Sequence, residues 1–425
     1  MSDAQLNVQA LAEAFAQAGQ SAIGEGAKDS SSLVELASAA PVVRLVDVML
    51  MEAVARRASD IHIEAFERQV MIRYRIDGRC YQVAQPPKSL ALAIASRIKV
   101  LSNLDVAELR LPQDGRILLT LHTRQIDLRV STLPTMYGES IVLRVLDKGA
   151  LEKTLGQLGM TPPMQQAIER LIKLPHGLLL VTGPTGAGKT TTLYACLSQL
   201  NTPEVKIITT EDPVEYDLPG LVQVTVNPKI ELDFSMCLRA ILRHDPDIIM
   251  VGEIRDQPTA QIAIQAALTG HSVFSTLHTN DAPGAVTRML DMGIESFLIT
   301  STVTGVLAQR LVRSLCTQCR SSYEATPDDL AALRLTADAV QQPLMRAVGC
   351  EVCNGIGYRG RCGLYELLVM SDPLRLLIVG GAGMSEIRAT ARAEGMLTLR
   401  EDGIAKVLAG LTTVEEMVRE TQDDV

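Results

Sequence analysis

A glycine-rich loop that ends in lysine and threonine is the first feature of this 425-residue sequence that could do chemistry. Residues 183–190 read Gly-Pro-Thr-Gly-Ala-Gly-Lys-Thr and lie between an apolar strand, 178–181, and a helix that begins at Thr190. This is the pattern G-x-x-x-x-G-K-[ST] in the strand–loop–helix context that it requires. Backbone N–H groups of such a loop surround phosphate oxygens, and the amino end of the helix adds positive potential. The loop therefore predicts a nucleoside triphosphate site.

Each residue type in this loop has an expected role. Lys189 would reach the β- and γ-phosphates, and the Thr190 hydroxyl would ligate Mg²⁺. The other nucleotide contacts are expected from Gly183, Pro184, Thr185, Gly186, Ala187, Gly188 and Thr191. A phosphate loop alone does not distinguish a motor from a kinase or a GTPase. However, the N-K-x-D motif of GTPases is absent from the sequence, and a small-molecule kinase would not need the large domain before the loop.

Acidic residues follow two other apolar strands. Glu253 comes just after the strand 248–251, and Glu211 opens an acidic cluster after the strand 207–210. A carboxylate at the carboxyl end of a strand beside a phosphate loop can polarise a water or hold one in the metal shell. The alternative for Glu253 is an acid at a helix start, stabilised by the helix dipole. The strand length and position favour the catalytic interpretation.

Two histidines, His271 and His278, bracket the strand 272–277. A single histidine is more often structural than catalytic. As a pair at the two ends of a sheet strand, they are predicted to sense the γ-phosphate.

Four cysteines have the spacing of a metal site. Cys316 and Cys319 form one C-x₂-C pair, and Cys350 and Cys353 form another, with thirty residues between the pairs. Two such pairs suit a tetrahedral Zn²⁺ held by four thiolates, with no position open for catalysis. The alternative is four unrelated cysteines. No such spacing relates the other four, which are expected to be core or half-buried thiols: Cys80, Cys196, Cys237 and Cys362.

The composition excludes several classes of protein. Hydrophobic residues make up 47% and charged residues 21%, so the chain is not disordered overall. A net charge of -9, 3% aromatic residues and no tryptophan argue against a nucleic-acid binder that works by bulk charge or base stacking. Neither a signal peptide nor an uncharged apolar run of about 18 residues is evident. We therefore expect a cytoplasmic protein with reduced thiols.

The pattern of elements predicts how these residues are positioned. Four buried apolar strands (178–181, 207–210, 248–251 and 273–276) alternate with helices, which indicates an α/β sheet covered on both faces. Alternating residues over 70–76, followed by Asp77-Gly78, predict a strand and a hairpin turn. The expected boundaries are a flexible Ala/Ser/Gly-rich segment 1–40, an α+β domain 41–147, a linker 148–160, a P-loop core 161–315, a tetracysteine subdomain 316–368 and a helical region 369–425.

Several motifs occur in the order of a known family. GPTGAGKTTTLYA (183–195), TEDPVEY (210–216), LRAILRHDPDIIMVGEIRD (238–256) and LTGHSVFSTLHTNDA (268–282) resemble the Walker A, Asp box, Walker B and His box of the secretion ATPases of type II secretion and type IV pilus assembly. The resemblance extends forward through ASDIHIE (58–64), LPQDGR (111–116) and RVSTLPTMYGESIVLRVL (129–146), and it covers about residues 41–425.

This resemblance implies an α/β fold with a P-loop, RecA-like ATPase core. A smaller α+β, PAS-like domain would precede the core, and a mostly helical, zinc-bearing region would follow it. The implied protein is a cytoplasmic homo-hexamer that hydrolyses ATP with Mg²⁺ and powers assembly of a pilus or pseudopilus. By motif matching, Glu253 is the expected catalytic acid and Glu211 a second acid near the attacking water. Arg129 and Arg144 match arginines that approach the γ-phosphate, where a guanidinium can neutralise developing charge.

The resemblance also bears on the branch of the family and on partners. Retraction ATPases usually lack the tetracysteine motif, and DMGIESFL (291–298) and GVLAQRLVR (305–313) are closer to the type II secretion branch than to the pilus branch. The implied partners are inner-membrane platform proteins, which would hold the enzyme at the membrane, although residues 1–40 look too short for the family's usual docking domain. The alternatives are a pilus-extension ATPase, a non-hydrolysing scaffold and a conjugation-type translocase. No nucleic-acid partner is expected.

Overall fold

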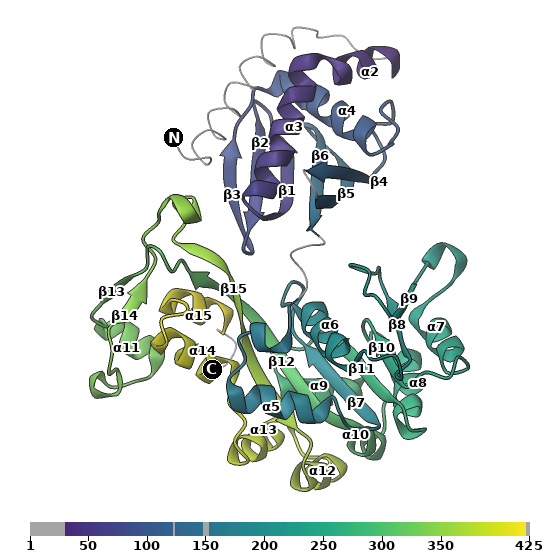
Figure 1. Ribbon diagram of the computed structural model, residues 1–425, viewed down its shortest axis with the longest axis vertical. Helices are drawn as coiled ribbons and strands as arrows, with labels where there is room; N and C mark the ends of the chain where they lie inside the picture. The colour runs from purple at the N-terminus through teal and green to yellow at the C-terminus, as the bar shows by residue number, and fades with distance from the viewer. Residues whose placement is uncertain (1–29, 122–123, 148–152, 422–425) are drawn as a thin grey trace. The chain divides into compact units, whose positions relative to one another are not determined.

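The computed structural model describes residues 30–121, 124–147 and 153–421 (Figure 1). The chain divides into two compact units, the first built mainly from residues up to Leu151 and the second from most of the residues after it. Within the described ranges, no helix combines the length and the apolar character needed to cross a bilayer.

The first unit is a six-stranded antiparallel sheet with helices on one face. Its strand order is β3-β2-β1-β6-β5-β4, and apolar side chains of α3 and α4 fill the core with those of the sheet. The strands are β1 (Ala58–Ala65), β2 (Val70–Ile76), β3 (Arg79–Ala84), β4 (Gln113–Leu121), β5 (Arg124–Thr135) and β6 (Gly138–Asp147). The helices are α2 (Ser30–Ser38), α3 (Ala40–Ala55) and α4 (Ala91–Leu101), with a 3₁₀ turn at Lys88–Leu90.

The period-two pattern of β2 has the predicted consequence. Ile72 and Tyr74 are fully buried on the helix side, and the Tyr74 hydroxyl donates to the Met49 carbonyl of α3 at 2.8 Å. The turn to β3 places Asp77 at φ 48° and Gly78 at φ 88°. Positive φ at both central residues is the geometry that a tight hairpin with the strands' natural twist requires. The α+β prediction for this part of the chain is confirmed.

The prediction of a flexible segment through residue 40 is wrong for its described part. Ser30–Ser38 form helix α2, which packs on α4, and α3 already begins at Ala40. Leu33 and Ala37 lie one helical turn apart and are buried. This i,i+4 apolar pair gives the helix a face to bury, and that outweighs the small polar residues around it. Residues 1–29 lie outside the described part of the chain.

The second unit is built on a seven-stranded sheet in the order β15-β12-β7-β11-β10-β8-β9. The six strands β12, β7, β11, β10, β8 and β9 are parallel to one another. β15 pairs with β12 in the antiparallel direction. The strands are β7 (Gly177–Thr182), β8 (Ile207–Glu211), β9 (Val222–Thr225), β10 (Ile248–Val251), β11 (Ser272–Leu277), β12 (Val303–Leu315) and β15 (Tyr358–Val369). The four predicted strands of the α/β pattern are all present.

Helices cover both faces of this sheet, as predicted (Figure 1). Helix α6 connects β7 to β8, which lies toward the β9 side of the sheet, whereas α7, α8 and α9 lead back step by step toward β12. Because crossovers between parallel strands are right-handed, α6 lies on one face of the sheet and the other three helices lie on the opposite face. The helices are α5 (Pro162–Leu171), α6 (Lys189–Leu200), α7 (Phe234–Ile241), α8 (Gln257–Leu268), α9 (Ala282–Asp291), α10 (Ser296–Thr302), α11 (Pro327–Leu333), α12 (Asp372–Val379), α13 (Met384–Ala393), α14 (Leu399–Leu408) and α15 (Val414–Glu420). A small sheet pairs β13 (Ser321–Tyr323) with β14 (Leu344–Arg346).

Two predicted boundaries differ from the structure. β15 lies within the expected tetracysteine subdomain, yet it belongs to the core sheet, because its apolar residues such as Leu364 and Leu368 are fully buried beside β12. The described end of the expected linker, from residue 153, is also packed. Leu158 is buried, and its carbonyl accepts a hydrogen bond from the Tyr365 hydroxyl at 3.0 Å. Residues 148–152 of that linker are outside the described ranges.

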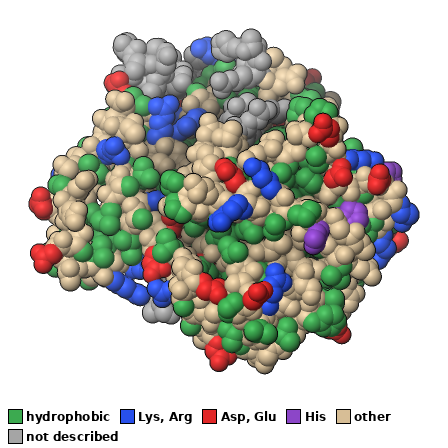
Figure 2. Space-filling view, turned by 60° about the horizontal axis from the view of Figure 1, so that its bottom comes forward, with side chains coloured by type: hydrophobic (Ala, Val, Ile, Leu, Met, Phe, Trp, Pro, Cys, Tyr) green, Lys and Arg blue, Asp and Glu red, His purple; other side chains and the backbone are tan. Residues whose placement is uncertain are grey.

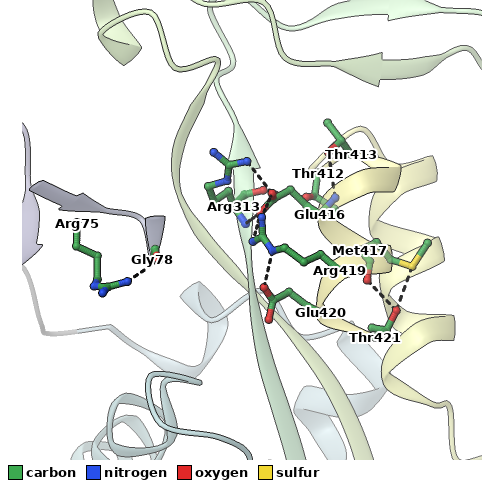
Figure 3. Close-up of polar contacts among 10 residues, drawn as sticks. All are labelled: Arg75, Gly78, Arg313, Thr412, Thr413, Glu416, Met417, Arg419, Glu420 and Thr421. Carbon is green, nitrogen blue, oxygen red and sulfur yellow. Dashed lines mark hydrogen bonds and ion pairs between the residues drawn. The ribbon is translucent and has the colours of Figure 1, made fainter. Parts of the chain in front are cut away.

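The carboxyl-terminal helix α15 is fixed to β12 by a buried ion pair (Figure 3). Arg313 Nη2 lies 2.6 Å from Glu416 Oε1, and the backbone N–H of Arg313 donates to the other carboxylate oxygen at 3.2 Å. The guanidinium also lies 3.8 Å from the centre of the Tyr358 ring, and Arg419 pairs with the same carboxylate. Such pairing allows both charges to be buried.

Candidate functional site

The glycine-rich loop has the predicted strand–loop–helix geometry. β7 ends at Thr182, and α6 begins at Lys189 with Gly188 as its N-cap. Gly186 and Gly188 have φ values of 81° and 86°, in the left-handed region where glycine carries no steric penalty. An alternation of such residues turns successive backbone N–H groups inward and forms a concave anion site. The loop can therefore hold phosphate, with the amino end of α6 beside it.

Lys189 lies folded against its own loop. Its Nζ donates to the carbonyl oxygens of Gly183 at 2.7 Å and Pro184 at 3.1 Å. Burial lowers the pKa of Lys189 to about 8, the negative charge of Glu253 raises it in part, and the positive charge of Arg310 lowers it further. The ammonium group is thus poorly solvated. The negative charge of a bound phosphate would stabilise its protonated form.

This pKa predicts a pH dependence of nucleotide binding. Phosphate is held by the ammonium form, so as the pH rises through about 8 the free protein loses the proton that binding needs. We expect ATP affinity to fall by up to about tenfold per pH unit above that point. Calorimetric titration with ATP from pH 7 to 9.5 measures it. The variant Lys189→Arg, whose side chain stays charged throughout, should show a flat profile. A flat profile in the unaltered protein would contradict the assignment.

Glu253 lies just beyond the carboxyl end of β10 and is mostly buried, with 13% of its side chain exposed. One of its carboxylate oxygens lies 2.5 Å from Arg255 Nη2, and the other lies 3.2 Å from His278 Nε2. His278 follows β11 directly, and the last two residues of β11 pair in register with the end of β7 at Val181 and Thr182. The structure therefore brings Glu253 and His278 together at the edge of the sheet where the phosphate loop begins.

Glu211 lies at the end of β8 and is buried, with 3% of its surface exposed. Its carboxylate accepts hydrogen bonds from the hydroxyls of Tyr194 and Thr209 and from the Gln223 side-chain amide at 3.0 Å. Burial raises the pKa of Tyr194, and the Glu211 charge raises it further, so the phenol keeps its proton. These contacts favour a role in fixing α6 and the edge strand β9. The predicted role of Glu211 near the attacking water stays a prediction.

The two histidines lie at opposite ends of strand β11. His271 precedes β11, its carbonyl accepts from the Gly177 N–H at the start of β7, and its ring Nδ1 lies 3.0 Å from the Ala266 carbonyl. Because β11 and β7 are parallel and in register, a full strand length separates His271 from the phosphate loop of its own chain. His278 therefore lies at the phosphate loop and His271 does not, and the phosphate-sensing role of both histidines stays a prediction.

Arg129 and Arg144 face each other on β5 and β6 in the first unit. They lie on the sheet face opposite the helices, in a row that continues to Arg116 on β4 and Asp60 on β1. Arg144 is 59% exposed, and its Nε donates to the buried Asp60 carboxylate at 3.3 Å. Like charges directly opposite repel one another, so this row favours an anionic partner.

The four predicted zinc ligands come together. The sulfur atoms of Cys316, Cys319, Cys350 and Cys353 all lie within 4.8 Å of one another. Those of Cys350 and Cys353 are 3.7 Å apart, close to the roughly 3.8 Å between two ligands of a tetrahedral ion with bonds of about 2.3 Å. Backbone N–H groups of Cys350 and Gly357 donate to the Cys353 sulfur at 3.2 Å each, which stabilises a thiolate. The arrangement fits a structural metal.

Two site residues were not found from the sequence. Gln309 and Arg310 lie on β12 beside the loop, where Gln309 donates to the Ala187 carbonyl at 2.7 Å and Arg310 donates to Asn280 at 3.1 Å. The available signal was a Gln-Arg pair inside the otherwise apolar run 305–312. Polar residues in a buried strand are costly unless they are hydrogen-bonded, so such a pair marks a specific partner.

Solved structures share this architecture. The ATPase DotB of Legionella pneumophila superposes with a TM-score of 0.67 over 89% of this chain and 95% of its own, at 21% identity, which shows the fold. The pilus retraction motor PilT, solved with bound ADP, has a TM-score of 0.58 over 88% of this chain and 95% of its own, at 25% identity. The expected α/β secretion-ATPase fold is confirmed.

Sequence comparisons identify the family. "Type II secretion system protein HxcR" of Pseudomonas aeruginosa is 49% identical over 97% of this chain and 87% of its own length. "Type II secretion system protein E" of Aeromonas hydrophila is 51% identical over 95% and 80%, and "Type II secretion system ATPase E" of Vibrio cholerae is 50% identical over 94% and 79%. A profile of the family described as "Type II/IV secretion system protein" matches residues 35–419. The chain therefore belongs to the type II/IV secretion system protein family.

Proposed function

We propose that this chain is the ATP-hydrolysing motor of a type II secretion system. The observation that carries the proposal is the grouping of a phosphate loop, Lys189, Glu253 and His278 at one sheet edge, in a chain about half identical to type II secretion proteins E. Steady-state phosphate release by the purified protein with ATP and Mg²⁺ tests it. Background release that does not depend on Lys189 would overturn it.

Hydrolysis needs a group that takes a proton from water as its oxygen attacks the γ-phosphorus and ADP leaves. Glu253 is suited to this step because it is mostly buried, lies at the loop edge and is oriented by His278 and Arg255. Lys189 would neutralise charge on the phosphates. The Thr190 hydroxyl, at the start of α6, would hold Mg²⁺, whose preference for hard oxygen ligands it fits. When bound there, Mg²⁺ would supply positive charge that offsets the charge of the phosphates.

Arg129 and Arg144 are proposed to neutralise charge on the transferring phosphoryl group. We expect Arg144→Ala to lower ATP turnover about ten- to a hundredfold and to leave ATP affinity and metal content unchanged. The loss stays below the roughly thousandfold or more of a lone arginine finger because Arg129, directly opposite, retains part of the charge. Turnover at saturating ATP measures the effect.

Arg116→Ala is the matched control for that variant. Arg116 lies in the same row and is 57% exposed, but it is paired with Asp127 through two hydrogen bonds. We expect its loss to change turnover less than about threefold. Equal losses in both variants would show that only the general charge of this face matters.

The motor would act as a homo-hexamer at the cytoplasmic side of the inner membrane. Platform proteins of the secretion system would hold it there. Each chain would carry one structural Zn²⁺. Size measurement with and without nucleotide tests the hexamer. Affinity capture from detergent-solubilised membranes, with the Lys189→Ala variant as a comparison, asks which inner-membrane proteins bind. Capture of pilus-assembly proteins alone would place the chain in the pilus branch instead.

A nucleic-acid translocase is the less favoured function. The chain carries a net charge of -9, and acidic and basic side chains are interspersed on the face drawn in Figure 2. Binding to phosphate backbones depends on clustered Lys and Arg. The charge distribution therefore favours protein partners.

A further inference from the structure

β12 extends beyond the strand that leads into the phosphate loop. Ala308 pairs in register with Thr182, the last residue of β7, so the residues after Ala308 run alongside the loop. β12 continues to Leu315 and holds α15 through Arg313. Beyond Ala308 the strand remains paired with β15 and is anchored through Arg313, so it provides a rigid wall for a loop of small residues.

Gln309 connects this wall to the loop and to the helix behind it. It is 2% exposed, its Nε2 donates to the Ala187 carbonyl at 2.7 Å, and its Oε1 accepts from the Thr192 hydroxyl at 2.7 Å. The carbonyl can only accept, so the amide orientation is fixed by its partner. Both ends of a buried amide are thereby satisfied by groups on either side of the α6 start.

The loop packs so closely against β12 that side chains at two of its glycines would clash with Gln309. A Cβ added to Gly188 would lie 2.8 Å from Gln309 Nε2, and one added to Gly183 would lie 2.5 Å from the Gln309 carbonyl oxygen. The C=O and N–H of a trans peptide point in opposite directions, so holding the Ala187 carbonyl on the β12 side directs the Gly188 N–H away from β12, where it can face phosphate. A peptide flip there would turn an oxygen toward the anion and replace attraction with repulsion.

We infer that Gln309 is a positioning residue that holds the phosphate loop in its phosphate-binding conformation and so sets the affinity for the polyphosphate part of the nucleotide. The inference rests on the proposed nucleotide site. Gln309 itself does not touch the nucleotide, and it acts through the Ala187 carbonyl. The backbone of such a loop surrounds the α- and β-phosphates, and its lysine reaches the β- and γ-phosphates. The effect should therefore be much larger for ATP than for AMP, which has only the α-phosphate.

Three variants separate positioning from space filling. Gln309→Met keeps the volume and removes both hydrogen bonds. Gln309→Glu keeps the oxygen that accepts from the Thr192 hydroxyl, but it places a carboxylate oxygen next to the Ala187 carbonyl oxygen, which repels it. Thr192→Val removes only the hydroxyl behind the amide. We expect ATP dissociation constants to rise about tenfold for Gln309→Met, more for Gln309→Glu and about two- to threefold for Thr192→Val, while AMP affinity stays within twofold.

Calorimetric titration of the full chain measures the affinities for ATP and AMP, and Mg²⁺ is left out so that ATP is not hydrolysed. Thermal unfolding of each variant is recorded as well. ATP affinity within twofold of the unaltered protein in all folded variants would overturn the inference. Equal losses for ATP and AMP that follow the melting temperature would also overturn it, because they indicate general loosening. If neither Gln309 variant folds, Thr192→Val decides by the same criteria. Failure of the unaltered protein to bind ATP would instead refute the proposed nucleotide site.

Discussion

Replacing Glu253 with glutamine should lower ATP turnover about thousandfold while ATP still binds. Glutamine has the same shape and can keep a contact to His278, but it cannot accept the proton that the attacking water must lose. General-base catalysis contributes about 10²–10⁴ in rate, and Glu253 is the carboxylate that the structure places at the loop edge beside His278. Phosphate release at saturating ATP gives the rate, and equilibrium titration gives the affinity.

ATP binding should not weaken in this variant. The variant removes one negative charge near Lys189, whose proximity to Glu253 is reflected in the lysine pKa, so ATP affinity should be unchanged or slightly higher. Glu204→Gln is the matched control, because Glu204 is exposed and precedes β8 at the opposite edge of the sheet. Turnover of Glu253→Gln within a few fold of the unaltered protein would remove Glu253 from the catalytic role.

Replacing Cys353 with serine should remove the metal and destabilise the second half of the chain. Purified, freshly reduced protein is expected to hold near one zinc per chain, and the variant near none. Structural zinc contributes on the order of 10 kcal/mol to the folding of small zinc domains. The core sheet does not depend on the metal alone, so we expect partial loss, with a fall in melting temperature on the order of 10 °C. Elemental analysis and thermal unfolding measure the two effects.

The control for this variant is Cys80→Ser, which removes a cysteine outside the sulfur cluster. It should leave both zinc content and melting temperature unchanged. Chelation of the unaltered protein should reproduce the destabilisation, and added Zn²⁺ should reverse it. A metal-free protein that is as stable as the loaded one would show that the four thiols are packed together without a structural ion.

Much of the fold could be predicted because its signals are local. The four parallel strands 178–181, 207–210, 248–251 and 273–276 are apolar runs separated by helices, and each is found in the sheet. Helix α2 was missed because its burial depends on α4, more than fifty residues away. The sequence does not predict β12 as a strand, because a buried apolar run has no periodicity that distinguishes a strand from a helix.

The sequence by itself determined the phosphate loop and the four thiols, because in both cases adjacent residues or fixed short spacings specify the chemistry. It also determined the family, through motifs kept in order. Only the tertiary structure decided which residues meet at the loop. The parallel register of β7 and β11 places His278 at the loop and His271 at the far edge, although both flank the same strand. The pairing of β12 with β7 likewise brings Gln309 to the loop from more than a hundred residues away. The Gln-Arg pair in an apolar run indicates that it has a partner, but local sequence does not say which one.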